Sequence, residues 1–397
     1  MLNKLCNLNA LLLALAPVLS VYSLAGLTMS FFVIWVVAGL NILAARRSLF
    51  NRRLELSFFL CILVLGFLSF LLNSGQGFYS TELYVNNLFA IVSFFIALVF
   101  CTSNVNINLF KKTVCFVGVI AACICIFQRL QFIATGSYLN NFFIAGLEVK
   151  RDLDMFSYGR PSAFFTEPAH LAIYLLPVLY LTLVEKRRLL SFVIGIGILV
   201  CGSTTGFLLL FVAFLFSLIR EGKSIKSIIF GGMLITALYG AVTYLSPDIL
   251  LSNMEKLQST ESDGSRLLGP LNYFKYYDFS QYLFGIGINQ MAAFLRSHGF
   301  VLVNAFNEEM DMNYANAVIY MVLCYGLIGG VVFVNYLTKT FKQYNCKVNA
   351  GYFVILLGIL FSDQVLFNMN FLYPLSFVIL LSKNETICVN EKTNSIV

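Results

Sequence analysis

Charged residues are scarce in this sequence. Only 11% of its 397 residues are Asp, Glu, Lys or Arg, whereas 59% are hydrophobic, and the mean hydropathy is +0.84. A soluble domain carries about 25% charged residues, so the composition excludes an ordinary soluble fold. The formal net charge of +7 does not point to nucleic acid. The positive side chains gather in short loops between apolar runs, where they face anionic lipid head groups.

Cysteine patterns typical of metal sites are also missing. The chain has ten cysteines but no CxxC pair and no Cys/His metal spacing, and Cys123 and Cys125 are only two residues apart. Most of the cysteines lie in apolar runs or in segments that we expect in the cytoplasm. We interpret all ten as small apolar or reduced residues, and we predict no metal and no cofactor.

Long apolar runs dominate the chain. A spanning helix needs about 20 apolar residues, and slightly fewer suffice for short or broken helices. We therefore expect an all-α polytopic membrane protein in which residues 1–397 form a single domain. The first run resembles a signal peptide, but the next run follows almost at once, which favours an uncleaved helix. The sequence predicts about twelve spans, at 8–25, 27–45, 54–72, 86–102, 113–133, 168–184, 189–202, 205–219, 227–245, 314–336, 350–366 and 369–382.

Lys and Arg crowd into every second loop between these runs. The main clusters lie at 46–53, 111–112, 186–188, 220–226 and 339–347, and the short loops between them carry no Lys or Arg. Cytoplasmic loops of membrane proteins are enriched in positive residues in this way. The pattern therefore places both termini in the cytoplasm.

Two long segments fall on the opposite, outer side, at 134–167 and 246–313, and they hold most of the acidic residues. Loops of this length in a compact protein are usually functional. The apolar residues of the second segment recur at helical spacing: Leu267, Leu268, Leu271, Phe274 and Tyr277. This spacing predicts a helix in the outer interface, with rings such as those of Tyr273 and Tyr277 at head-group depth. Gly285-Ile286-Gly287 would end that helix.

The run Arg160-Pro161-Ser162-Ala163-Phe164-Phe165-Thr166-Glu167-Pro168-Ala169-His170 lies at the outer mouth of the sixth span. Arg160 has the planar fork that binds phosphate or carboxylate bidentately. Glu167 is a candidate general base. His170 falls in the first turn of a helix that begins at Pro168, where negative charge is favoured. The alternative is that Arg160 and Glu167 form an interfacial salt bridge and that Pro168 only starts the helix.

Three further clusters have a functional and a structural interpretation. Arg266, in Asp263-Gly264-Ser265-Arg266, suits a lipid-linked phosphate or simply anchors a helix to head groups. The polar break Gly202-Ser203-Thr204-Thr205-Gly206 lines a cavity or forms a tight helical hairpin. The segment 304–316 carries three acids that suit sugar hydroxyls, or it is a solvated loop. Asp363 is an acidic residue within a predicted span, and an intramembrane acid is a functional candidate.

The 160–170 run resembles a recurring signature of the Wzy-type O-antigen and exopolysaccharide repeat-unit polymerases. Gly264-Ser265-Arg266, followed by Tyr282-Leu283-Phe284-Gly285-Ile286-Gly287, resembles it too, as do the number of spans and the two unequal outer loops. In layout the resemblance covers nearly the whole chain, but in residues it covers only a few short motifs. It implies a GT-C-like membrane glycosyltransferase in the bacterial inner membrane.

O-antigen ligases share this architecture and resemble the chain at 202–206 and at Tyr325-Gly326-Leu327-Ile328-Gly329. Ligases typically carry a His-Asn pair about eleven residues before that glycine, where this chain has Ala315 and Asn316. The missing histidine favours a polymerase.

The resemblance implies an inverting transfer of a growing glycan from undecaprenyl pyrophosphate to a repeat unit on the same lipid. Arg160 and Arg266 would stabilise the pyrophosphate without a metal, and Glu167 or His170 would take the acceptor proton. Tyr273, Tyr277 and Asn316 would bind substrate. A flippase and a chain-length regulator are implied partners, besides membrane lipids. A lipid-linked oligosaccharide flippase is the competing class, but coupled transporters usually place ionisable residues near the midplane, and these spans contain few.

Overall fold

The computed structural model describes residues 2–24, 27–44, 52–137, 146–149, 160–244, 269–300, 315–344 and 349–394, and it is predominantly helical. Each predicted apolar run contains a helix. Its helices in chain order are α1 (Leu2–Leu19), α2 (Met29–Ala44), α3 (Arg53–Asn73), α4 (Thr81–Ile96) with its π-helical continuation η2 (Ala97–Cys101), α5 (Ile107–Thr135), α6 (Pro168–Val184), α7 (Arg188–Val200), α8 (Thr204–Arg220), α9 (Ile225–Tyr244), the 3-10 helix η4 (Gly269–Tyr276), α11 (Phe279–Phe284), α12 (Met291–Ser297), α13 (Ala317–Gln343), α14 (Asn349–Ser362) and α15 (Met369–Asn394).

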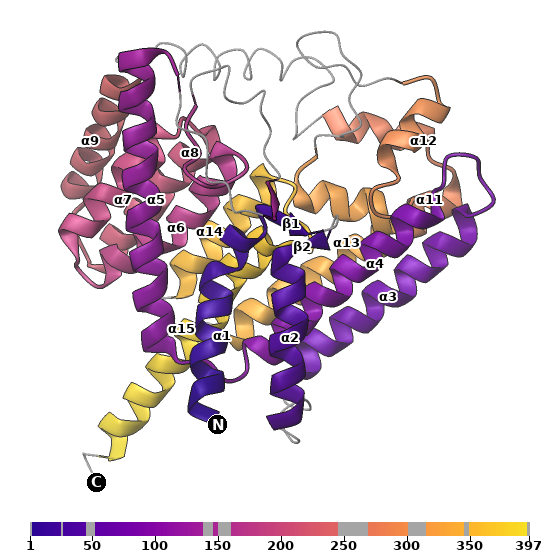
Figure 1. Ribbon diagram of the computed structural model, residues 1–397, viewed down its shortest axis with the longest axis horizontal. Coiled ribbons are helices and arrows are strands. Elements are labelled where there is room, and N and C mark those ends of the chain that lie inside the picture. Colours follow the sequence, from indigo (N-terminus) through magenta and orange to yellow (C-terminus); the bar gives the residue numbers. More distant parts are fainter. Residues whose placement is uncertain are drawn as a thin grey trace.

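Four helices in the described ranges are long and apolar enough to cross a membrane: α3, α4 with η2, α5 and α13. Several shorter apolar helices accompany them. These are the helices of a multi-pass membrane protein. Figure 1 shows that the start of α1 and the end of α15 lie at the same end of the molecule, whereas α11 and α12 lie at the opposite end.

A small antiparallel sheet, which the sequence analysis did not predict, lies at the connection between α1 and α2. Strand β1 (Tyr22–Leu24) pairs with β2 (Leu27–Thr28) on one side and with β3 (Glu148–Val149) on the other. The helix predicted at 8–25 therefore ends earlier, at Leu19. These strands have only two or three residues each, too few for alternation to be recognised in a sequence.

The centre of the protein is α6. Every residue from Leu171 to Thr182 is buried, and a helix that is apolar and buried all round belongs in the core of a bundle. From Met369 to Ser382, α15 is buried in the same way. The two helices meet where the rings of Tyr174 and Tyr373 stack, with centroids 4.5 Å apart. The residues just before α6 are thereby held against the most rigid part of the molecule.

A buried ion pair ties three helices together at the end where α1 begins. The Arg52 guanidinium lies 3.0 Å from the Glu55 carboxylate and donates to the Tyr344 hydroxyl and to the carbonyl and hydroxyl oxygens of Thr102. Burial raises the pKa of Tyr344, and of the two charged neighbours Arg52 lowers this pKa whereas Glu55 raises it. Arg52, counted in the sequence among the loop charges, thus joins the start of α3 to the ends of η2 and α13.

Helix α13 is broken at Gly326, whose φ is 68° and ψ −173°. The extended segment 285–287 crosses the break. The N–H groups of Ile286 and Gly287 donate to the Leu323 and Cys324 carbonyl oxygens at 3.2 and 2.9 Å. A break in a helix frees such carbonyl groups, and burial requires that they be paired. Segment 285–287 therefore completes the hydrogen bonding of α13.

Gly285 and Gly326 make this crossing sterically feasible. Both have positive φ. A Cβ atom on Gly285 would lie 2.2 Å from the Cys324 carbonyl carbon, and one on Gly326 would lie 2.1 Å from the Leu283 carbonyl oxygen. The Gly285 carbonyl in turn accepts from the side chains of Ser69 and Asn73 on α3. The crossing thus joins α3, α13 and the second outer segment.

The sequence analysis predicted one interfacial helix from the spacing at 267–277, and this prediction is wrong. Residues 269–276 form the 3-10 helix η4, which ends before Tyr277-Asp278, and a separate helix, α11, begins at Phe279. Asp278 caps α11 in a capping box with Gln281, in which each side chain accepts from the other residue's backbone N–H. This reciprocal pairing starts a new helix where the apolar spacing alone would continue the old one.

Replacing Gly326 by alanine should destabilise the protein strongly. The added methyl group would collide with the Leu283 carbonyl at a position where φ is positive, and we expect a loss of about 3 kcal/mol or more. The midpoint of SDS-induced unfolding, measured on the purified protein, reports this loss. Gly195→Ala on α7 is the matched control, because an added Cβ there meets nothing within 4 Å, and alanine should stabilise the helix slightly. Equal midpoints for the two variants would contradict the role of the crossing.

Candidate functional site

The run 160–170 forms a tight buried turn at the start of α6. Arg160, Pro161, Ser162 and Ala163 are all buried. The Gln128 side chain on α5 donates to the Ala163 carbonyl at 3.1 Å and accepts from the Ala163 N–H at 2.8 Å. Ala163 has a φ of 51°, an uncommon value for a residue with a side chain. Gln128 therefore holds the turn in a conformation that it would rarely adopt alone.

The turn is wedged among three helices. The Cys125 thiol on α5 contacts the carbonyl oxygens of both Pro161 and Gly197, which places the turn beside α7. Phe165 is buried with its ring centroid 5.1 Å from that of Tyr174 on α6. Inside the turn, the Phe165 N–H donates to the Ser162 carbonyl and the Ser162 hydroxyl donates back to the Phe165 carbonyl. The backbone polar groups of this irregular segment are thus largely paired within the protein, as burial demands.

Arg160 lies in the turn that leads into α6, and it immediately precedes Pro161, whose carbonyl contacts the Cys125 thiol that also contacts Gly197 on α7. Helix α8 begins beside α6, since a Cβ atom on Gly206 would lie 2.8 Å from Cβ of Ala172. Arg160 has only 5% of its surface exposed, so its charge acts in a region of low dielectric constant, where electrostatic interactions are strong.

The polar break at 202–206 is a helical hairpin turn, the structural alternative of the sequence analysis. Gly202 has a φ of 68°, and Ser203 caps α8 by accepting from the Gly206 N–H at 3.2 Å. Residues 201–203 are buried in protein. The start of α8 consequently lies beside the first turn of α6, and each start carries the positive end of a helix dipole.

Glu167 and Arg160 do not form the salt bridge that was the structural alternative for this pair. Glu167 precedes Pro168 as the N-cap of α6, and its carboxylate accepts no capping hydrogen bond. Its side chain is half-buried and makes no ion pair within the part of the chain that the structure describes. His170, one turn into α6, is also half-buried, and its Nδ1 is hydrogen-bonded to the Thr166 hydroxyl. Glu167 therefore keeps both oxygens available.

Sequence reasoning missed Gln128 as a support of this site and gave Arg129 little weight. Arg129 follows Gln128 on α5, has 4% of its surface exposed, and acts electrostatically on Cys125. In the sequence, Arg129 is one of the few ionisable residues within a predicted span. A buried arginine in an apolar helix is itself a signal of function. Its position next to the turn, however, depends on packing between helices.

The other predicted site residues lie elsewhere or outside the described ranges. Arg266 and the acidic residues of segment 304–314 fall outside the described residues. Asn316 is buried and caps α13, with its side-chain oxygen accepting from the Ile319 N–H at 2.9 Å. Asp363 is buried beside it, and its carbonyl accepts from the Ala317 N–H. Among described residues no group of three His, Cys, Asp or Glu could hold a metal ion.

Tyr273 and Tyr277 are buried, with 2% and 8% of their surfaces exposed. The Tyr277 hydroxyl donates to the Leu323 carbonyl at 2.9 Å, next to the break in α13, and burial raises the pKa of Tyr277 well above its usual value. The ring of Tyr273 packs edge-on against Phe300. Both rings pack inside the protein here, and their predicted role in substrate binding stays a prediction.

The structure therefore places a buried arginine, a carboxylate without an ion pair among the described residues and the start of α6 within one short stretch of chain, with the start of α8 packed against α6. Arginine and helix N-termini are groups that bind anions, and a carboxylate can accept a proton. In comparisons with known proteins, no protein-family model matches the chain, and no curated protein sequence matches it significantly.

Proposed function

We propose that this protein is a repeat-unit polymerase of the O-antigen type, which transfers a growing glycan from undecaprenyl pyrophosphate to a lipid-linked repeat unit. The observation that carries the proposal is the burial of Arg160 in the turn that leads into α6, a helix whose first turn packs against the start of α8. This arrangement suits a pyrophosphate group, which needs positive charge as it leaves. The resemblance of the 160–170 run to the polymerase signature points to the same chemistry.

In the proposed reaction a hydroxyl oxygen of the acceptor sugar attacks the anomeric carbon of the donor. The bond from that carbon to the pyrophosphate oxygen breaks, and the electron pair leaves with the pyrophosphate. Arg160 and the N–H groups at the starts of α6 and α8 stabilise the developing negative charge. Glu167 takes the proton, since its carboxylate is in no ion pair with Arg160, whereas His170 is hydrogen-bonded to Thr166.

The proposal includes about twelve membrane spans in the bacterial inner membrane, with both termini in the cytoplasm and the site on the periplasmic side. The arrangement of α1, α15, α11 and α12 in Figure 1 supports this orientation. Helix α5 extends from Gln128, beside the turn, to Thr135, about 10 Å at 1.5 Å per residue. The proposed site therefore lies about two turns below the end of α5.

An O-antigen ligase is the nearest alternative, because the break of α13 at Gly326 lies in the motif that ligases share. At the position of the ligase histidine, however, this chain has Ala315, which is fully buried. A flippase is disfavoured because the buried ion pair at Arg52 and Glu55 lies near one end of the molecule and ties helices together.

Reporter fusions test the orientation. Fusions after Arg188 and Lys223 should give cytoplasmic signals, and fusions within the exposed turns at Gly77 and Gly299 should give periplasmic signals, because positive loops stay inside. The side of the membrane on which each fusion point lies is measured by alkaline phosphatase activity and green fluorescent protein fluorescence, each normalised to expression. A cytoplasmic signal at Gly299 would overturn both the orientation and the proposed face of the active site.

Substitution of Arg160 tests the catalytic proposal. Lysine keeps the charge but loses the planar fork, so Arg160→Lys should impair polymerisation and Arg160→Ala should impair it more. Losing one such stabilising contact costs about 3 kcal/mol, roughly a hundredfold in rate. The readout is the lipopolysaccharide ladder on a gel, normalised to the amount of membrane protein. Arg188→Ala, at an exposed arginine at the start of α7, is the control. Bare core in the Arg160 variants, rather than core capped with one repeat, would indicate a ligase.

Substitution of Glu167 tests the base. Glu167→Gln keeps the shape but cannot take a proton, so turnover should fall about a hundredfold or more, whereas His170→Gln should have a smaller effect. Glu82→Gln, at an exposed carboxylate in the first turn of α4, should leave the ladder unchanged. A normal ladder from Glu167→Gln at normal protein abundance would remove the carboxylate from the mechanism.

A further inference from the structure

An open groove lies between α8 and α9. Figure 1 shows α9 at one edge of the molecule, and α9 packs against α7 and α8. The free space in the groove is about 650 Å³, within the range of roughly 300–1,000 Å³ that is typical of small-molecule sites. The groove is lined by Phe211 and Leu215 on α8 and by Ile229, Gly232, Met233, Thr236 and Ala237 on α9.

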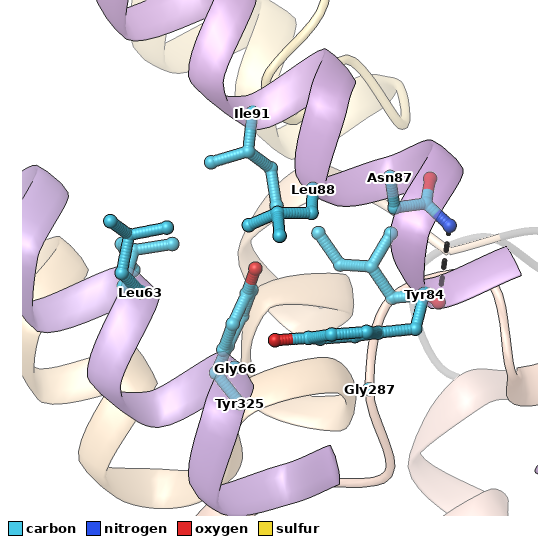
Figure 2. Close-up of a pocket in the computed structure, with 10 residues that line it drawn as sticks. Leu63, Gly66, Tyr84, Asn87, Leu88, Ile91, Gly287 and Tyr325 are labelled. Carbon is cyan, nitrogen blue, oxygen red and sulfur yellow. Dashed lines mark hydrogen bonds between the residues drawn. The ribbon is translucent and has the colours of Figure 1, made fainter. Parts of the chain in front are cut away.

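The recess beside the crossing segment is far smaller. Figure 2 shows this recess, which Leu88 and Ile91 line together with Tyr84 and Tyr325. Its free space of about 20 Å³ holds little more than one water molecule. The groove between α8 and α9 is therefore the better candidate for a ligand.

The lining of the groove suits a hydrocarbon chain. Thr236 has the polar side chain among the lining residues, and its hydroxyl donates to the Gly232 carbonyl at 3.0 Å within α9. Ile229 and Met233 have 53% and 66% of their surfaces exposed. A sugar or a peptide backbone in such a groove would lose hydrogen bonds to water and gain few in return. The occupant is therefore apolar where it lies in the groove.

Small residues of α9 account for the shape of the groove. Gly231 is buried, and a Cβ atom there would lie 2.2 Å from Cε1 of Phe214 on α8, so the two helices approach closely at this point. The next residue, Gly232, lines the groove together with Ala237. Because these residues add little volume, space remains beside the contact between the helices.

A basic loop lies at one end of the groove. The connection from α8 to α9 carries the exposed cations Arg220, Lys223 and Lys226 and one acidic residue, Glu221, so the net charge of residues 220–226 is +2. Lys223 lies 3.8 Å from Glu221 at an exposed position, where such a contact is weak. The loop therefore attracts anions.

The loop and the groove are continuous along α9. Lys226 precedes Ile229 by three residues, which places both on the same face of the helix. From Ile229 to Ala237 the groove extends about 12 Å at 1.5 Å per residue. A molecule with a negative head and a hydrocarbon tail matches both parts, with its head at the loop and its tail in the groove.

A second copy of the chain fits this surface poorly. A symmetric contact uses the same patch on both subunits, so a dimer formed through the groove would bring two loops of charge +2 together. A phospholipid with a negative head group complements the loop instead. Basic pockets between membrane helices on the cytoplasmic side bind such head groups.

We propose that the groove between α8 and α9 binds one acyl chain of an anionic phospholipid, whose phosphate contacts Arg220, Lys223 and Lys226. The bound chain fills the space beside α9 and stabilises the helical hairpin that packs against the start of α6. The cytoplasmic leaflet as the source of this lipid rests on the proposed orientation. The binding itself does not depend on the proposed glycosyl transfer.

Photo-cross-linking of the purified protein in nanodiscs tests the groove. The probe is phosphatidylglycerol with a diazirine in one acyl chain, and phosphatidylethanolamine with the same chain is the comparison. We expect chymotryptic peptides from 208–219 and 225–237 to be labelled at least fivefold more by the phosphatidylglycerol probe. Ala237→Phe should fill the groove and lower this labelling at least fivefold. Val331→Phe on α13, at a residue with 70% of its surface exposed, should leave the labelling unchanged.

A charge variant tests the head-group contact independently of the groove. Lys223→Gln combined with Lys226→Gln should abolish the preference for phosphatidylglycerol, because each cation near the membrane surface attracts anionic lipid. Lys339→Gln combined with Lys342→Gln removes the same charge at exposed positions near the end of α13 and should leave the preference intact.

Equal labelling by the two probes, or a preference for phosphatidylglycerol that the Lys223 and Lys226 changes leave intact, would overturn the proposal. A dimer in native mass spectra that Ala237→Phe dissociates would assign the groove to a second copy instead. Arg160→Ala should leave the labelling unchanged. A labelled groove in a protein whose ladder does not respond to Arg160→Ala would exclude the polymerase and retain the lipid site.

Discussion

The break in α13 at Gly326 frees the carbonyl groups of Leu323 and Cys324, and these must be paired inside the protein because a membrane core offers no water. Segment 285–287 supplies the two N–H groups, and the Tyr277 hydroxyl supplies a third donor. The placement of η4, α11 and α12 follows from this pairing, since the chain can cross α13 only where both backbones are glycine. Gly287 of the crossing segment also lines a small recess together with residues of α3, α4 and α13.

The same requirement shapes the site around Arg160. A turn with a positive φ at Ala163 cannot pair its own backbone groups in a regular element, and Gln128 does this from α5. Both irregular segments therefore depend on amides and hydroxyls that neighbouring helices contribute, Gln128 on α5 in one case and Ser69 with Asn73 on α3 in the other. In both places, polar side chains on neighbouring helices hold irregular backbone in position.

Much of the helical layout could be predicted from the sequence, because apolar runs and the start at Pro168 are local signals. The crossing of Gly285 and Gly326 could not be predicted, because the two glycines are 41 residues apart and no sequence pattern indicates that they pack together. The apolar spacing at 267–277 misled because the capping box at Asp278 outweighs it. For the site, residue types identified Arg160, Glu167 and His170, but only packing reveals Gln128 or the burial of Tyr273 and Tyr277.

The complete burial of α6 has a consequence for how the protein is made. A helix that leaves the ribosome midway through synthesis enters the bilayer with lipid on the sides that protein later covers. Tyr373, which stacks on Tyr174 less than two turns from Pro168, is translated about two hundred residues after it. The region around Arg160 is therefore completed among the last events of biogenesis. A nonsense codon shortly before α15 would remove no residue of the site and would still leave it unfinished.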